Sequence, residues 1–139
     1  RWIVTARARG DRGTVSAMVA VVAIGLVMVA GLAYDGGQIV AAQATARDLA
    51  ANAARAGAQE VDPQELRATG VAALDPDLAA QAVDDYLAGT GHTATVSVAG
   101  STITVAVTVV QPMRILPMPD RIVVAVDSAS AVTEEPSDG

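Results

Sequence analysis

Few residues in this chain have a type and a spacing that chemistry could use. His92, the single histidine, lies between an expected helix end and an expected strand, so we interpret it as a loop or cap residue. Two carboxylate pairs, Asp75 with Asp77 and Asp84 with Asp85, come nearest to an acid–base constellation. The chain has no cysteine, which excludes disulfides, thiolate metal ligands and thiol nucleophiles.

Simpler roles account for these carboxylates. Asp75 stands before a proline in DPDL, and Asp62 does so in DPQEL, so each is placed to cap a helix that begins at the proline. Asp84 and Asp85 point to different parts of a helix surface and are expected in solvent. The chain also lacks a glycine-rich phosphate loop, a zinc-ligand spacing and a nucleophile elbow. We therefore expect no enzyme: no catalytic residues, no metal, no cofactor and no small-molecule substrate.

The most informative segment of the chain is an unbroken run of uncharged residues from Thr14 to Tyr34. At about 1.5 Å per residue, a helix over this run spans roughly 30 Å, the thickness of the hydrocarbon core of a bilayer. The run therefore predicts one transmembrane helix over residues 14–34.

Charge is divided sharply around this run. Residues 1–13 carry a net charge of +3, whereas residues 35–139 carry −9. Positive charge beside an apolar span favours the cytoplasmic side. We therefore expect residues 1–13 to be a basic cytoplasmic leader and the acidic part to be extracytoplasmic. The acidic balance also argues against nucleic acid as a partner.

Three interpretations of the N-terminal region remain open. The run could be a permanent signal anchor. It could be a signal peptide cleaved before Tyr34, where Gly31 and Ala33 form a small-residue site. It could also be a pilin-type leader cleaved between Gly13 and Thr14. The three differ in the N-terminus of the mature protein, and hence in whether it stays in the membrane.

The helix is expected to continue beyond the span as an Ala-rich extension over residues 35–61. It should stop near Gly57–Pro63, where the Asp62-Pro63 step breaks helical geometry. Gly36-Gly37 could kink it at the membrane surface. We interpret Asp35 as the interfacial charge that ends the span, and a packing or register contact in an assembly is the alternative. Small residues that would let like helices approach closely are Ser16, Ala20, Gly25, Ala33 and Gly37.

Residues 62–132 are expected to form a small extracytoplasmic α+β domain. The segments after the two capping aspartates predict two short helices. From Thr93 the apolar period changes to two residues, and a turn at Ala99-Gly100 or Gly100-Ser101 predicts a β-hairpin over 93–110. Residues 121–132 are expected as a third strand and residues 133–139 as a disordered tail. The residues expected on the apolar face of the second short helix are Leu78, Ala82, Val83, Tyr86 and Leu87.

The predicted fold class is α+β. A single N-terminal transmembrane helix continues as a long Ala-rich helix, and short helices and a three-stranded antiparallel sheet follow it. A hydrophobic anchor helix packed on a small antiparallel sheet is the architecture associated with pilins.

The segment between the second and third strands, QPMRILPMPD, contains three prolines and is expected to have no regular structure. We interpret it as a lid on the core, and docking onto a partner or onto the membrane is the alternative. The side chains that would make such a contact are Met113, Ile115, Leu116 and Met118.

The stretch RGDRGTVSAMVAVVAIGLVMVAGLAYDGGQIVAAQATARDLAANAARAGA resembles the N-terminal region of TadE/TadG-like proteins. These are pilin-like membrane proteins of the tight-adherence (Tad, Flp-type) pilus machinery, common in actinobacteria among others. The likeness covers roughly residues 7–60 and lies in the RGDRG lead-in, the Asp35-Gly36-Gly37 exit, and the Ala-rich helix with Asp48 and Arg55 that ends in RAGA.

One position separates this chain from members that prepilin peptidase cleaves. Those members usually have Glu at the fifth position after the cleaved glycine, where this chain has Met18 if Gly13 is that glycine. No acidic residue occurs anywhere in 14–34. The likeness therefore points to the uncleaved, TadG-like side of the family.

The resemblance implies a structural role, as a minor pilin, a pseudopilin-like component or an assembly factor of a Tad-type pilus or secretion apparatus. Its partners would be the membrane, crossed once, and other pilin-like or pilus-assembly subunits. The alternative is a membrane-tethered or secreted extracytoplasmic binding module, for which the span is only a tether or a leader.

Overall fold

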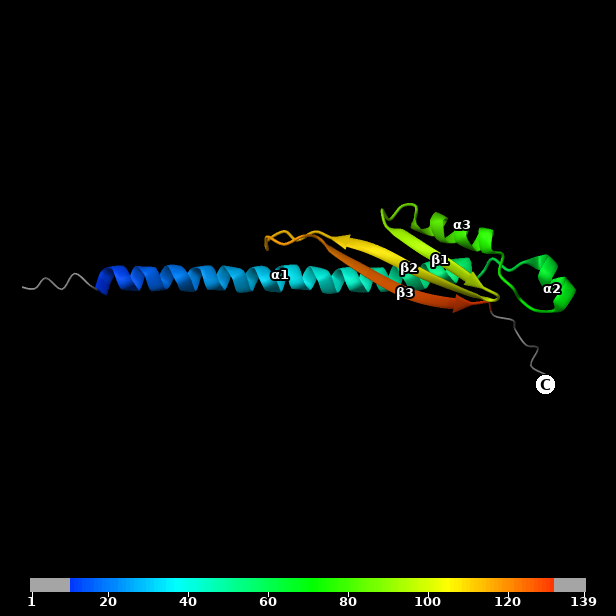
Figure 1. Ribbon diagram of the computed structural model, residues 1–139, viewed down its shortest axis with the longest axis horizontal. Coiled ribbons are helices and arrows are strands. Elements are labelled where there is room, and N and C mark those ends of the chain that lie inside the picture. Colours follow the sequence, from blue (N-terminus) through cyan, green and yellow to red (C-terminus); the bar gives the residue numbers. More distant parts are fainter. Residues whose placement is uncertain (1–10, 132–139) are drawn as a thin grey trace, which may run out of the picture.

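The computed structural model describes residues 11–131 and shows one long helix with a small α+β domain packed along its C-terminal half (Figure 1). The long helix, α1 (Asp11–Gly57), is followed by two short helices, α2 (Pro63–Thr69) and α3 (Pro76–Leu87). Three strands complete the fold, β1 (Thr93–Ala99), β2 (Thr102–Gln111) and β3 (Arg121–Ser130). The predicted α+β class is confirmed, with its long N-terminal apolar helix, short helices and three-stranded antiparallel sheet.

Helix α1 has 47 residues and is α-helical without interruption, so Gly36-Gly37 does not break it. It ends at Gly57, at the start of the region Gly57–Pro63 in which the sequence predicts the helix to stop. The cause lies in the next segment, where Val61 forms a bridge with Leu74 and the Asp62 N–H donates to the Ala73 carbonyl. This pairing holds residues 61 and 62 in extended backbone geometry, so the helix cannot continue through them.

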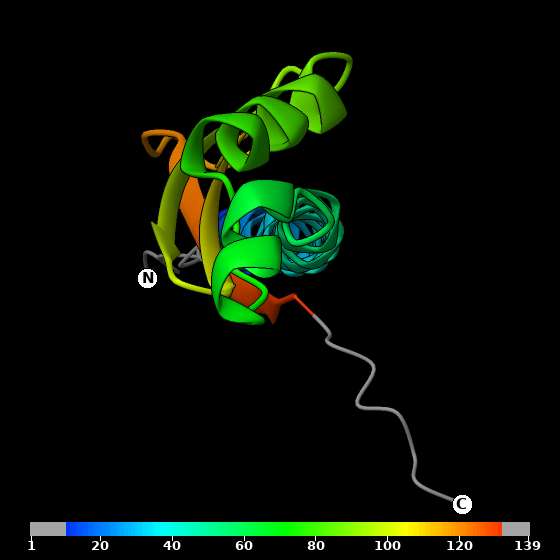
Figure 2. The same ribbon diagram turned by 90° about the vertical axis from the view of Figure 1, so that its right-hand side faces the viewer.

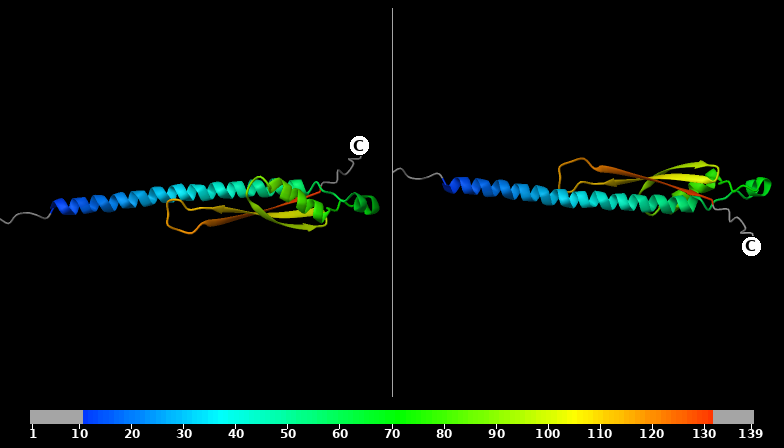
Figure 3. Two further views of the ribbon diagram at one scale, coloured as in Figure 1. Left: turned by 90° about the horizontal axis from the view of Figure 1, so that it is seen from above. Right: turned by 90° about the horizontal axis from the view of Figure 1, so that it is seen from below.

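The two halves of α1 differ in what covers them. All residues from 13 to 30 are exposed in the described structure, and the helix contains a segment long and apolar enough to cross a membrane. Beyond residue 30 one side of the helix is buried at intervals, beneath the β2–β3 loop at Gly31 and Asp35 and beneath the sheet from Ala42 onward. We call residues 13–30 the bare half of α1. Residues 31–57, which the domain covers on one side, are the sheathed half. Figure 3 shows the helix and the domain from two further directions.

The sheet has the order β1-β2-β3, and both neighbouring pairs are antiparallel. Ala99 pairs with Thr102, so the hairpin turn is Gly100-Ser101, one of the two predicted positions. Gly100 has a φ of 61°, which the two-residue turn requires and which glycine adopts at low cost. The third strand ends at Ser130 instead of residue 132, and residues 132–139, including the predicted tail, lie outside the described residues.

Helices α1 and α3 lie side by side on one face of the sheet (Figure 2). Helix α1 crosses β2 and β3, and α3 covers β1. The buried positions of α1 that meet the sheet are alanines, with Leu49 partly buried beside them, and the strands supply the larger side chains of the core. The buried alanines on α1 are Ala42, Ala46, Ala50, Ala53 and Ala54, and the buried residues of β2 opposite them are Ile103, Val105, Val107 and Val109.

The apolar face of α3 differs from the prediction. Ala79, Val83 and Leu87 are buried, whereas Leu78 and Tyr86 are 46% and 41% exposed. The buried residues recur every four positions, so α3 turns only a narrow stripe toward β1 and α1. The predicted face was therefore correct at Val83 and Leu87 and wrong at Leu78 and Tyr86.

Both predicted helix caps are confirmed. The Asp62 carboxylate accepts hydrogen bonds from the backbone N–H groups of Gln64 and Glu65, at 2.7 and 3.3 Å. The Asp75 carboxylate accepts from those of Asp77 and Leu78, at 3.0 and 3.1 Å. These bonds satisfy N–H groups that have no partner within the helix, which explains why α2 and α3 begin where the sequence indicates.

Candidate functional site

The most unusual feature of the described structure is a buried carboxylate, that of Asp35 on α1, which is 2% exposed. It accepts three backbone hydrogen bonds from the loop between β2 and β3. The donors are the N–H groups of Arg114, Ile115 and Leu116, at 3.4, 3.2 and 2.8 Å. Three successive N–H groups that converge on one carboxylate form an anion-binding concavity, and here helix α1 supplies the anion. The contact joins segments about 80 positions apart in the sequence.

The hydrogen bonds and burial act on the Asp35 carboxylate in opposite directions. The N–H of Leu116 has the largest effect and favours the ionised form, burial disfavours it, and the N–H groups of Ile115 and Arg114 favour it again. The net result is a pKa for Asp35 below the ordinary value for an aspartate. The carboxylate is therefore ionised at neutral pH and holds the loop as an acceptor.

One turn before Asp35, Gly31 completes the docking position of the loop. Gly31 is buried, and a Cβ atom built there would lie 2.7 Å from Cγ2 of Ile115 and 3.9 Å from Cδ2 of Leu116. The loop thus packs directly on the helix backbone at Gly31. The helix sequence at this point is specific: a residue without a side chain at position 31 and an acceptor at position 35.

A substitution at Gly31 is expected to loosen the loop. In Gly31→Leu the new side chain must displace Ile115, which we expect to weaken docking by about 1–3 kcal/mol, the usual cost of overpacking. Hydrogen–deuterium exchange of the amides at 114–116, measured on the full chain in detergent micelles, should accelerate accordingly.

Gly25→Leu is the matched control, because a Cβ at Gly25 meets nothing within 4 Å. It should leave exchange in the loop unchanged. Equal exchange in the Gly31 and Gly25 variants would contradict the docking geometry.

The four apolar loop residues that were predicted to make contacts differ in their exposure. Met113 and Leu116 are partly buried, whereas Ile115 and Met118 are 50% and 43% exposed. The loop forms no regular element, as predicted, and it covers α1 rather than the centre of the sheet core. Asp35 follows directly on the uncharged run, and its carboxylate faces the loop and not solvent.

The predicted helix-packing residues all lie on exposed parts of α1. They are Ser16, Ala20, Gly25, Ala33 and Gly37. Ala33 and Gly37 lie about 200° around the helix from the loop contact at positions 31 and 35, whereas Ala20 is about three turns before Gly31 on the same side. The residues therefore form no continuous stripe, and the buried alanines that face the protein's own sheet were not among them.

The other residues singled out from the sequence remain scattered. Gly13 and Thr14, the candidate processing site, lie in the first turns of α1. His92 lies in the turn between α3 and β1, where its backbone N–H donates to Oγ1 of Thr90. Asp84 and Asp85 are exposed on α3. Among residues 11–131, no three His, Cys, Asp or Glu side chains come together in a group that could hold a metal ion.

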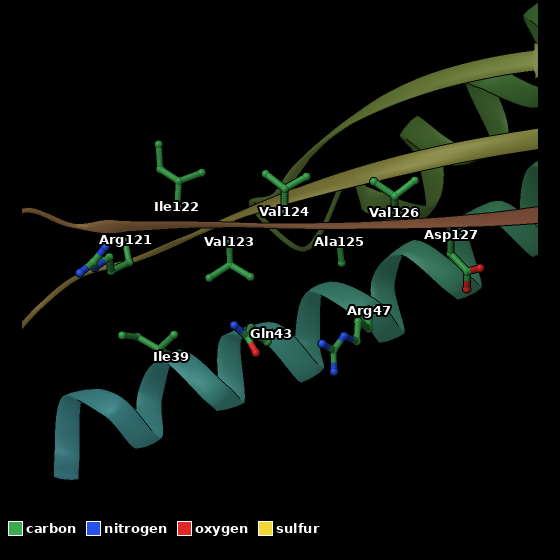
Figure 4. A pocket seen from close by; sticks show the side chains of 10 residues that line it. All are labelled: Ile39, Gln43, Arg47, Arg121, Ile122, Val123, Val124, Ala125, Val126 and Asp127. Atoms are coloured by element: carbon green, nitrogen blue, oxygen red, sulfur yellow. The ribbon is translucent and has the colours of Figure 1, made fainter. Parts of the chain in front are cut away.

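A second feature is an open groove of about 800 Å³ between α1 and the free edge of β3 (Figure 4). Its floor on the helix side is a stripe of Ile39, Gln43 and Arg47, and β3 lines the other side from Arg121 to Asp127. Figure 4 shows the side chains of Val123 and Ala125 pointing toward the helix, while Ile122, Val124 and Val126 point to the opposite side of the strand. The groove thus offers the unpaired backbone of an edge strand, with charged residues at Arg47, Arg121 and Asp127, which suits binding of an extended segment better than catalysis.

Sequence reasoning found the loop and Asp35 separately but not their contact. The signal that joins them is indirect: a lone acidic residue just after an apolar span, and an apolar loop in which three consecutive N–H groups stand between prolines. No family model matches this chain, and no curated protein and no solved structure matches it either.

Proposed function

We propose that this chain is a pilin-like, single-pass membrane protein. It acts as a minor pilin, a pseudopilin-like component or an assembly factor of a Tad-type pilus or secretion apparatus. Its work is helix packing and partner binding, without turnover of a substrate. The basic leader lies in the cytoplasm and the acidic α+β domain outside the cell membrane.

The observation that carries this proposal is the contrast between the two halves of α1. All residues from 13 to 30 are exposed, and most of them are large and apolar. Such a surface needs lipid or other apolar helices around it, because water would make its exposure costly. A half-helix of this kind, continuous with a sheathed half, can serve both as an anchor in a bilayer and as a packing element among like helices.

In the sheathed half of α1, only part of the helix surface is open to a like helix from another subunit. The protein's own sheet covers the buried alanines of α1, so a neighbouring subunit has access to the bare half and to the exposed side of the extension. Ala33 and Gly37 lie on that exposed side and would permit close approach. The resemblance to TadE/TadG-like proteins supports the same role, since it is strongest along this helix.

A charge at the middle of the span is expected to abolish the function. In Gly25→Arg, an arginine near the centre of the apolar run costs about 2.5–3.5 kcal/mol on insertion scales. We expect the variant to move from the carbonate-resistant membrane fraction to the soluble or degraded fraction and to fail in assembly, and Ala20→Arg to behave similarly.

Gly25→Ala and Asp84→Ala are the matched controls and should both be silent, because neither adds charge to the span and Asp84 is exposed on α3. Normal membrane integration together with normal pilus output from the Arg variants would overturn the proposal.

The mature N-terminus separates a filament subunit from a permanent assembly factor. The intact mass and N-terminal sequence of the membrane-extracted protein should show a chain that retains Arg7–Gly13, as the absence of an acidic residue in 14–34 favours. A chain that begins at Thr14 would instead indicate a processed subunit that enters a filament. A chain that begins at Tyr34 would contradict membrane anchoring altogether.

One observation favours a second candidate, a tethered binding module. The outer face of the sheet carries exposed apolar side chains at Val110, Ile122, Val124 and Val126, next to the groove at the β3 edge. A monomeric domain seldom exposes such a cluster without a partner. Proteins that cross-link to Val124 but not to α1 would favour this function, whereas cross-links through the bare half of α1 would favour assembly.

A further inference from the structure

The loop at residues 112–120 is the part of the domain nearest to the bare half of α1. In Figures 1 and 3 it extends past the ends of β2 and β3 along the helix toward the N-terminus. Its contact with Gly31 places it about 4.5 Å inside the end of the uncharged run at Tyr34, at about 1.5 Å per residue. Any medium that surrounds the helix at this level must therefore meet the loop as well.

The charge of Asp35 is not exposed at the surface of the helix. The ionised carboxylate is 2% exposed and accepts hydrogen bonds from three backbone N–H groups. The next ionisable residue on α1 is Arg47, about 18 Å further along the helix. The nearest exposed charges belong instead to the base of the loop, at Arg114, Asp120 and Arg121.

The backbone N–H groups of the loop tip are paired within the protein, which insertion into an apolar environment requires of them. Non-helical backbone enters a bilayer only when its polar groups are satisfied within the protein. The N–H groups of residues 114–116 donate to Asp35, and that of Met118 donates to the Leu116 carbonyl at 2.8 Å. Residues 117 and 119 are prolines and have no N–H. No backbone donor from 114 to 119 is left to water.

The exposed side chains of the loop tip also suit an apolar environment. Ile115, Pro117, Met118 and Pro119 are exposed at the tip and are all apolar. At the base, Arg114 and Arg121 can extend their charged ends to headgroup phosphates, and Asp120 between them marks the aqueous side. A membrane partner explains both the apolar tip and its charged base.

We infer that the loop tip, residues 115–119, is a second membrane contact that inserts into the outer leaflet beside α1. The inference rests on the proposed anchoring of α1 in the membrane. Two contacts fix the tilt and rotation of the domain, so that the groove at β3 and the exposed face of the sheet keep a constant orientation relative to the bilayer. For a protein that meets other subunits at the membrane surface, this constant orientation lowers the entropic cost of assembly.

The test uses single cysteines, which the absence of native cysteine makes simple. Full-length Met118→Cys, Leu26→Cys and Asp84→Cys, each labelled with an environment-sensitive fluorophore, are reconstituted into vesicles of phosphatidylcholine and phosphatidylglycerol. Quenching is measured with aqueous iodide and with lipids that carry a nitroxide near the top of the acyl chain. Leu26 reports on the span, and Asp84 reports on the exposed surface of α3.

We expect the label at Met118 to be quenched strongly by the nitroxide lipid and several-fold less by iodide than the label at Asp84. A label at Met118 that behaves like that at Asp84, while Leu26 remains buried, would overturn the inference and leave the anchoring intact. The same holds if Met118 is shielded in native membranes but open to iodide in pure lipid, since a protein partner would then cover it. If Leu26 itself is open to iodide, the anchoring proposal fails as well.

Discussion

Replacing Asp35 with alanine is expected to release the 112–120 loop from α1. The variant removes the one acceptor that three backbone N–H groups share, and nothing else in the described structure bonds to those groups. Loss of such bonds should raise the exchange rate of the amides at 114–116 on the order of 10- to 100-fold. The measurement is hydrogen–deuterium exchange of the full chain in detergent micelles.

The control for this variant is Asp48→Ala, which removes a carboxylate from the exposed side of the same helix. It should leave exchange in the loop unchanged. A docked and protected loop in Asp35→Ala would show that packing of Ile115 and Leu116 is sufficient and that the carboxylate is dispensable.

The same contact has a defined dependence on pH. Because the pKa of Asp35 is lower in the folded protein than in the unfolded chain, its contribution to stability is present above the ordinary pKa of an aspartate. The contribution decreases as the pH falls through the folded pKa, where the carboxyl becomes protonated. The difference in loop protection between the wild type and Asp35→Ala should therefore be constant near neutral pH and disappear in acid.

Replacing Ile103 with alanine is expected to be the most damaging change in the sheet domain. Ile103 is fully buried, and its Cδ1 occupies the space that a Cβ on Gly57 of α1 would need. Removing it leaves a cavity between the helix end, α3 and β2, at a cost of about 2–5 kcal/mol. This is a large share of the roughly 5–15 kcal/mol that stabilises a typical domain. Urea unfolding of the full chain in micelles, followed by circular dichroism, measures it.

Ile122→Ala is the matched control, because Ile122 lies in the same sheet but is 69% exposed on the opposite face. We expect a loss below about 1 kcal/mol, the span of strand propensities. Equal losses at the two isoleucines would mean that the two faces of the sheet are buried to a similar extent in the micelle-bound protein.

The sequence was sufficient wherever a signal depends on neighbours a few residues apart. The uncharged run predicted the apolar helix, Asp62 and Asp75 predicted the helix starts, and the period of two residues predicted the strands. The Gly100-Ser101 turn belongs to the same group, since its geometry depends on glycine at one position. Each of these features is encoded in one continuous segment of the sequence, so no tertiary information is needed to read it.

Other features depend on which segments meet in space, and there the sequence left the answer open. The alanines of α1 suggested close packing but not that the protein's own sheet would cover them. Leu78 and Tyr86 were predicted for the core together with Val83, and the orientation of α3 on β1 and α1 leaves both exposed. Gly36-Gly37 could have kinked the helix, yet the helix runs through without a break.

The candidate site shows this division most clearly. The sequence by itself determined its parts: a carboxylate just beyond an apolar span, a glycine one turn earlier, and an apolar loop braced by prolines. The tertiary structure alone decided that the loop returns to the helix and places three N–H groups on Asp35. A buried carboxylate is stable only where donors surround it, and these donors come from a segment about 80 residues away, whose position is fixed by the pairing of β2 with β3.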